Sequence, residues 1–181
     1  EKDGLQQQTV TILDDDPVPV VTLSVGGSSI NESGLGNSTL VIATIPVVAG
    51  RDVNVAVQKS GVAKDGIDYA LAGMIIIPAG SKTASITLAS IGDTLHELNE
   101  TVIIDISCDV TCTEGNSDGV GLEQETVTIP NDDPSPTVAL TVGSEMLNES
   151  APGNSTTVTA TISTASGLDV TVVLVKTGMA T

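Results

Sequence analysis

Residues 53–58 read VNVAVQ, and this short stretch decides the fold class. Val53, Val55 and Val57 alternate with polar or small residues, which is the pattern of a half-buried β-strand. Val127 and Ile129 alternate in the same way within residues 123–129, which read EQETVTI. Strand-like runs of this kind recur through the middle of the chain, at residues 20–25, 39–45, 53–58, 74–77, 84–88, 101–106 and 123–129.

The composition agrees with these runs. The 181 residues include 23 Val, 23 Thr and 15 Ile, so that β-branched residues, which suit a pleated sheet, make up about a third of the chain. The 18 Gly and 8 Pro separate the runs. Short strands divided by turn residues predict an all-β fold, an immunoglobulin-like antiparallel β-sandwich. With no Phe or Trp, its core is expected to consist of Val, Ile and Leu.

The charge is strongly acidic and limits the kinds of partner. There are 23 Asp and Glu against 6 Lys and Arg, which gives a formal charge of −17. Nucleic acid and anionic membranes require a basic surface, so we expect neither as a partner, and no apolar run approaches the roughly 18 residues of a membrane span. The single His and the absence of a Ser–His or Cys–His arrangement predict that the chain is not an enzyme.

An internal repeat divides the chain. Residues 17–64 return at residues 134–181 with 24 of 48 positions identical, an offset of 117 residues. We therefore predict three parts: the C-terminal strand of a preceding repeat (1–16, strand at 9–13), one complete domain (17–133), and the N-terminal part of a following repeat (134–181). Residues 137–176 of that last part are expected to form three strands. The chain would then be a window from a longer tandem array, with neighbouring repeats or head-to-tail copies of itself as partners.

Acidic residues are expected to gather at one end of the complete domain. Alternate loops of an antiparallel sandwich lie at the same end. Four such segments are acidic, and they carry Glu32, Asp65, Asp68, Asp93, Glu97, Glu100, Asp132 and Asp133. Two carboxylates 4 Å apart repel by about 1 kcal/mol in water and about 4 kcal/mol at an effective dielectric of 20. Ca²⁺, which takes six to eight oxygen ligands, would relieve this repulsion; a solvated acidic surface is the alternative.

Motifs in these loops resemble a known family. They are INESG at 30–34, GVAKDGIDY at 61–69, IPAG at 77–80, GDTLHELNETV at 92–102 and TVTIPNDDP at 126–134. In this order they are similar to the Calx-β domains of sodium/calcium exchangers, integrin β4 and large extracellular and bacterial surface proteins. The resemblance covers residues 17–133 and implies seven calcium ligands: Glu32, Asp68, Asp93, Glu97, Glu100, Asp132 and Asp133. Gly92 and Asn131 stand where the family has acids, so we expect one or two ions.

Other residues carry weaker signals. Cys108 and Cys112 are spaced for a small disulfide, with free thiols or a cross-link to another chain as the alternatives. We expect His96 to be an exposed loop residue and Tyr69 to be a packing anchor. Five sequons of the form N-x-S/T are candidate glycosylation sites in a secreted eukaryotic protein, at Asn31, Asn37, Asn99, Asn148 and Asn154.

The function that these features predict is that of a calcium-binding structural or adhesive repeat. It would belong to a long, fibre-like extracellular or cell-surface protein, in which calcium makes the junction between repeats rigid. The alternative is a calcium-sensing regulatory domain attached to a membrane transporter or receptor.

Overall fold

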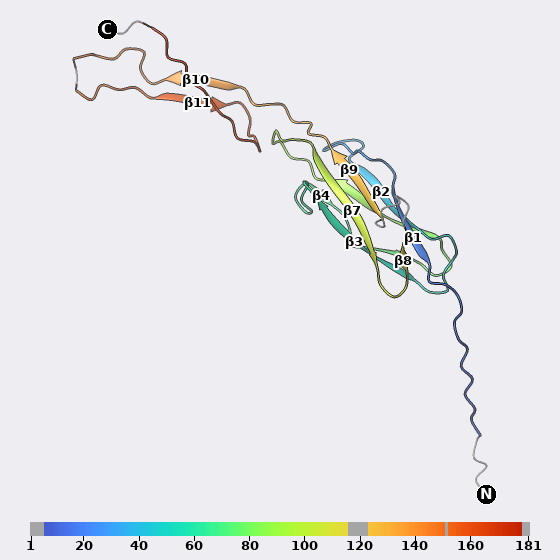
Figure 1. The fold of residues 1–181 in the computed structure, drawn as a ribbon. Helices are drawn as coiled ribbons and strands as arrows, with labels where there is room; N and C mark the ends of the chain where they lie inside the picture. Colours follow the sequence, from blue (N-terminus) through green and yellow to red (C-terminus); the bar gives the residue numbers. More distant parts are fainter. Residues whose placement is uncertain (1–5, 116–122, 151, 179–181) are drawn as a thin grey trace.

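The computed structural model describes residues 6–115, 123–150 and 152–178, and shows an all-β protein (Figure 1). Two sheets pack face to face in the middle of the chain. The first has the strand order β4-β6-β2-β1-β8 and the second the order β5-β3-β7-β9. Their bounds are β1 Val20–Val25, β2 Ser38–Thr44, β3 Val53–Gly61, β4 Tyr69–Ala70, β5 Met74–Ile77, β6 Thr83–Ser90, β7 Glu100–Cys108, β8 Thr113–Glu114 and β9 Gln124–Ile129. The predicted sandwich is confirmed.

The core lies between the sheets and is aliphatic, as the composition predicts. In β3, Val53 and Val55 are completely buried, and Val57 nearly so, while the residues between them are more exposed. β3 pairs with β5 and β7 in antiparallel register, and its buried valines belong to the same core cluster as buried residues of β1 and β2 in the other sheet. Tyr69 is 1% exposed, which confirms it as a packing anchor.

All seven predicted strands form, and two very short ones were not predicted. β4 pairs with the end of β6, and β8 lies parallel to the start of β1. One further contact shapes the site described below. After β1 the chain crosses to the second sheet, where Ile30 N–H donates to Thr128 O (3.0 Å) and Thr128 N–H donates to Ser28 O (2.9 Å). The segment that follows β1 is thereby held beside the end of β9.

The two ends of the chain differ from the expectation. Residues 9–13 form no strand, and Val10, Ile12 and Leu13 are each more than 80% exposed, because none of the strands in the described part of the chain lies beside them. In the described part of 134–178 two strands form, β10 (Val138–Val142) and β11 (Val158–Ile162), and the third predicted strand does not. In the complete domain its counterpart β3 is held between β5 and β7. β10 and β11 pair in the register of β1 and β2, with Leu140 opposite Ala160 as Leu23 is opposite Ala43.

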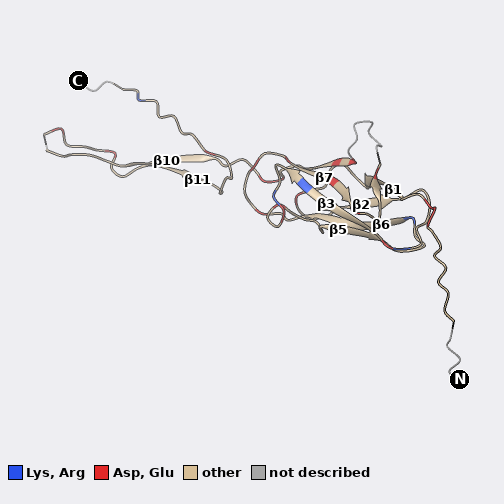
Figure 2. Cartoon of the chain, turned by 60° about the horizontal axis from the view of Figure 1, so that its bottom comes forward, with Lys and Arg blue, Asp and Glu red and all other residues tan. Residues whose placement is uncertain are grey.

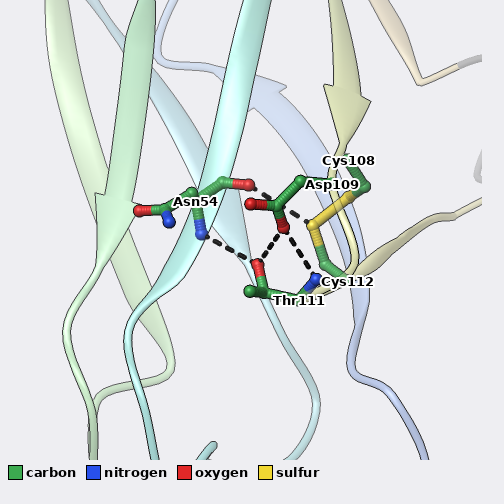
Figure 3. Close-up of a disulfide and its surroundings, with 5 residues drawn as sticks. All are labelled: Asn54, Cys108, Asp109, Thr111 and Cys112. Atoms are coloured by element: carbon green, nitrogen blue, oxygen red, sulfur yellow. Dashed lines mark hydrogen bonds between the residues drawn. A yellow bond between two sulfur atoms is a disulfide. The ribbon is translucent and has the colours of Figure 1, made fainter.

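The predicted cysteine pair forms an intrachain disulfide (Figure 3). Cys108 ends β7, and Cys112 precedes β8 and is 4% exposed. The turn between them is held by Asp109, whose carboxylate accepts hydrogen bonds from the Thr111 N–H (2.7 Å) and hydroxyl group (2.5 Å). These bonds lower the pKa of Asp109. Thr111 Oγ1 in turn accepts the Asn54 N–H (3.2 Å), so that the turn is fixed to β3.

Candidate metal centre

The four acidic segments meet at one end of the sandwich, the end from which the chain continues towards β10 (Figures 1 and 2). Glu32 follows β1, Asp68 precedes β4, Asp132 and Asp133 follow β9, and the β6–β7 loop (residues 91–99) with the first residue of β7 supplies Asp93, Glu97 and Glu100. The loops approach one another because the strands that lead into them, β1, β6, β3 and β9, run towards the same end of the sandwich. The tail before β1 leaves from the opposite end (Figure 1).

Six of the seven predicted ligands form two groups of three carboxylates. Glu32, Asp93 and Asp133 make the first group, and Asp68, Glu97 and Glu100 make the second. Within each group one oxygen atom from every residue lies within 4.8 Å of the others. A single pocket is lined by members of both groups, together with Asn131 and the apolar side chains of Ile91, Leu98 and Ile129.

Asp132, the seventh predicted ligand, lies outside both groups. Its carboxylate accepts a hydrogen bond from the Ser33 hydroxyl group (2.7 Å), and its own N–H donates to Glu32 Oε2 (3.2 Å). Asp132 therefore joins the segment after β9 to the segment after β1. In this position Asp132 is suited to hold Glu32 in place, and it is not a member of either group.

Backbone hydrogen bonds orient several of the carboxylates. Asp68 Oδ2 accepts the Lys64 N–H (2.6 Å), and Asp93 Oδ1 accepts the Leu95 N–H (2.7 Å). The Ser90 hydroxyl group lies 2.7 Å from the carbonyl oxygen of Glu32 and so fixes the backbone of that residue. The acidic side chains are thus presented by ordered turns.

Asn131 has a structural role that the sequence did not reveal. Its Oδ1 atom accepts the Glu97 N–H (2.9 Å), and its Nδ2 atom donates to Asp133 O (2.9 Å). Its own N–H donates to Asn99 Oδ1 (3.1 Å). Asn131 therefore fastens the β6–β7 loop to the chain leaving β9. The sequence feature that could have indicated this role is the Asn itself, which stands where the Calx-β motif has an acid. An amide side chain can both donate and accept hydrogen bonds here, whereas a carboxylate can only accept them.

The electrostatics of the site favour a bound cation. The ion pair found among the described residues joins Lys59 to Asp65 (2.5 Å), and Asp65 belongs to neither group of three. The six acidic residues of the two groups therefore form no ion pair with a described Lys or Arg. Burial, followed by the charges of Asp68 and Glu97, raises the pKa of Glu100 to about 7. Burial also raises the pKa of Glu32. Negative charge is therefore disfavoured at this end of the metal-free domain.

The donor chemistry fits a calcium ion. Asp133 Oδ2 is a buried carboxylate oxygen without a hydrogen-bond partner among the described residues, an arrangement that costs free energy unless something else satisfies the atom. Both groups offer only carboxylate oxygens, and Ca²⁺ is a hard cation that takes oxygen ligands, whereas Zn²⁺ prefers nitrogen and sulfur. Glu32, Asp93 and Asp133 would hold one ion, and Asp68, Glu97 and Glu100 a second.

The pKa of Glu100 predicts an unusual pH dependence of stability. Because this pKa is about 7 in the folded state and near 4.5 in the unfolded chain, folding takes up a proton between these values. The stabilisation is complete below pH 4.5 and is lost as the pH rises through 7. We expect the metal-depleted chain to melt at a higher temperature at pH 5 than at pH 8, measured by circular dichroism. Glu100→Gln should flatten the profile, and an unchanged profile would contradict this assignment.

His96 is less exposed than the sequence suggested, and it belongs to neither carboxylate group. Its Nδ1 atom lies 3.0 Å from Asp133 O and its Nε2 atom 3.1 Å from Ser135 Oγ. This fits an imidazole that donates from Nδ1 and accepts at Nε2. The expectation of an exposed loop residue is wrong, because Asp133 and Ser135 of the chain that leaves β9 lie against the ring.

The candidate glycosylation sites lie outside the strands, in loop segments. In two of them the amide nitrogen to which a glycan would be attached already donates a hydrogen bond, from Asn31 to Leu35 O (2.6 Å) and from Asn154 to Asn148 O. Asn99 uses its side-chain oxygen to hold Asn131. Glycosylation at the five sequons stays a prediction.

The comparison with known proteins identifies the fold. No protein-family model and no curated protein sequence matches the chain. A solved structure of CBD12 from CALX1.2 matches with a TM-score of 0.52 and 18% identity, over 67% of this chain. The fold is Calx-β-like. The alignment spans 48% of the CBD12 chain. The apo-form Calx CBD1 domain also matches, with a TM-score of 0.48 and 16% identity, over 63% of this chain and 99% of that domain.

No helix among the described residues has the length and hydropathy that crossing a bilayer requires.

Proposed function

We propose that this chain is a calcium-binding β-sandwich module. The observation that carries the proposal is that two groups of three carboxylates form at one end of the sandwich and that five of these six residues line one pocket. The sixth residue, Asp133, has a buried carboxylate oxygen without a hydrogen-bond partner in the described structure. Without a bound ion, the folded protein must hold these negatively charged carboxylates close together in spite of their mutual repulsion. A divalent cation removes that cost and supplies the missing partner for Asp133.

We further propose a structural or adhesive role in a long extracellular or cell-surface protein. The disulfide supports an oxidising compartment, and the 117-residue repeat in the sequence supports a tandem array. Asp133 precedes Pro134 directly, and Pro136 follows, so the linker to the next unit is short and stiff. Calcium held by Asp133 would fix this linker to the end of the domain and make the junction rigid.

The Calx-β-like fold favours a second role, that of a calcium sensor attached to a membrane transporter or receptor. The two roles differ in affinity. Extracellular modules bind calcium with dissociation constants of about 10⁻⁴–10⁻³ M, whereas sensors fall at roughly 10⁻⁷–10⁻⁵ M.

Calorimetric titration of the metal-depleted full chain tests the proposal. We expect each chain to bind one or two Ca²⁺ ions and to bind Mg²⁺ far more weakly. Asp133→Asn and Glu100→Gln should each weaken binding by roughly tenfold or more, since even outer partners of metal ligands are worth that much. Glu125→Gln removes the same charge from the start of β9, away from the pocket, and is the matched control.

Two results of this titration would count against the proposal. An absence of calcium binding would contradict the proposal. Equal weakening by Glu125→Gln would show that the ions respond only to the overall charge of the chain and occupy no defined site.

A further inference from the structure

The following unit touches the β6–β7 loop of the complete domain at one turn. Gly167 N–H donates to His96 O (3.1 Å), and the Ser166 hydroxyl group lies 3.4 Å from the same oxygen. His96 and Ser166 also form an isolated parallel β-bridge. The turn around Ser166 and Gly167 follows β11, so it belongs to the unit that begins after the linker.

Gly167 approaches Glu97 so closely that no side chain fits between them. A Cβ atom on Gly167 would lie 2.7 Å from Glu97 Cγ and 3.0 Å from Cδ, and it would overlap Oε1. These are side-chain atoms, so a larger residue at 167 would displace the Glu97 carboxylate. That carboxylate belongs to the second candidate ligand group, with Asp68 and Glu100.

The complete domain contains the same turn without this contact. Gly50 lies 117 residues before Gly167 and occupies the equivalent position in the repeat. A Cβ atom on Gly50 would meet nothing within 4 Å. Neither glycine has a positive φ, so an alanine suits the backbone at both positions. The pair separates the effect of contact with Glu97 from the effect of the substitution itself.

The β6–β7 loop is thus held from two sides. The His96 ring lies between Asp133 O and Ser135 Oγ, at the exit of β9, while the His96 carbonyl oxygen accepts the Gly167 N–H. The residue next to it, Glu97, is held at its N–H by Asn131 and bounded at its side chain by Gly167.

We propose that the Ser166–Gly167 turn of the following unit docks on the β6–β7 loop and thereby positions the Glu97 carboxylate. Gly167 is a positioning residue in this account, and the following unit completes the surroundings of the second carboxylate group. The contacts of Ser166 and Gly167 with His96 support the docking directly, whereas its effect on calcium binding rests on the proposed function.

The test compares Gly167→Ala with Gly50→Ala in the full chain. In the metal-depleted protein, amide chemical shifts in the ¹H–¹⁵N NMR spectrum report the docking. We expect Gly167→Ala to shift the amide signals of residues 94–98, and Gly50→Ala to leave them unchanged. Calcium titration then reports the positioning of Glu97. Gly167→Ala should weaken binding by roughly tenfold, the scale of losing a group that orients a ligand, and Gly50→Ala should not.

Each result decides one part. If Gly167→Ala leaves the signals of residues 94–98 in place, the docking is wrong, whatever calcium does. If those signals shift and calcium affinity stays the same, the positioning of Glu97 is wrong. If the signals shift but the unmodified chain binds no calcium, the proposed function fails and the docking stands.

Discussion

Saturating calcium is expected to raise the midpoint of thermal unfolding of the metal-depleted chain by roughly 10 °C or more. An ion that binds only the folded state at a thousandfold excess over its dissociation constant contributes about 4 kcal/mol. Each kcal/mol moves the midpoint by roughly 2–4 °C in a domain of 150–250 residues, and by more in a smaller one. Burial and the neighbouring charges, which together raise the pKa of Glu100, disfavour its ionised form, and a bound cation offsets this cost.

Circular dichroism at pH 8 measures this shift, since Glu100, with a pKa of about 7, is then largely ionised. Magnesium at the same concentration controls for ionic strength and charge screening. The double variant Asp133→Asn, Glu100→Gln removes one carboxylate from each group and should lose most of the calcium-induced rise in the unfolding midpoint. A midpoint that calcium does not move, or moves as much as magnesium does, would contradict the account.

The substitution Tyr69→Ala is expected to destabilise the domain by about 3–5 kcal/mol, the usual range for truncating a large aromatic residue in a core. Tyr69 is 1% exposed and is the largest fully buried side chain. It also pairs with Ser90 in the first sheet, and its carbonyl oxygen accepts the Gly66 N–H (2.7 Å). These contacts are made by the backbone and remain in the variant, so the expected loss comes from the buried ring.

Urea unfolding followed by circular dichroism measures the effect. Fluorescence is unsuitable because Tyr69 is the only aromatic residue apart from His96. Tyr69→Phe preserves the ring and is expected to cost less than about 1.5 kcal/mol, as other swaps that conserve volume do. A loss below about 1 kcal/mol for Tyr69→Ala, the size of an average substitution, would show that Tyr69 does not anchor the core.

The long strands were predictable because their side chains alternate over several residues. Val53, Val55 and Val57 mark β3 without any knowledge of its neighbours. The two-residue strands β4 and β8 carry no such period, and they exist only because β6 and β1 lie beside them. The reverse error occurred at residues 9–13, where the sequence alternates but none of the strands that the structure describes lies alongside to accept the backbone hydrogen bonds.

The gathering of the acids was predictable from topology, because alternate loops of an antiparallel sandwich share an end. Their division into two groups was not, since it depends on how each turn directs its side chain. Asp132 illustrates this limit: it neighbours Asp133 in sequence but binds Ser33. The contact of Gly167 with Glu97 joins residues 70 positions apart across the linker, and no pattern in the sequence marks it.

A crystal structure of the full chain grown with calcium tests the central claim most directly. Anomalous diffraction locates the ions independently of the protein coordinates. We predict an ion with oxygen atoms of Glu32, Asp93 and Asp133 at about 2.3–2.6 Å, with a second such position at Asp68, Glu97 and Glu100 if two ions bind. An empty pocket at saturating calcium, or ions bound only elsewhere on the surface, would contradict the account.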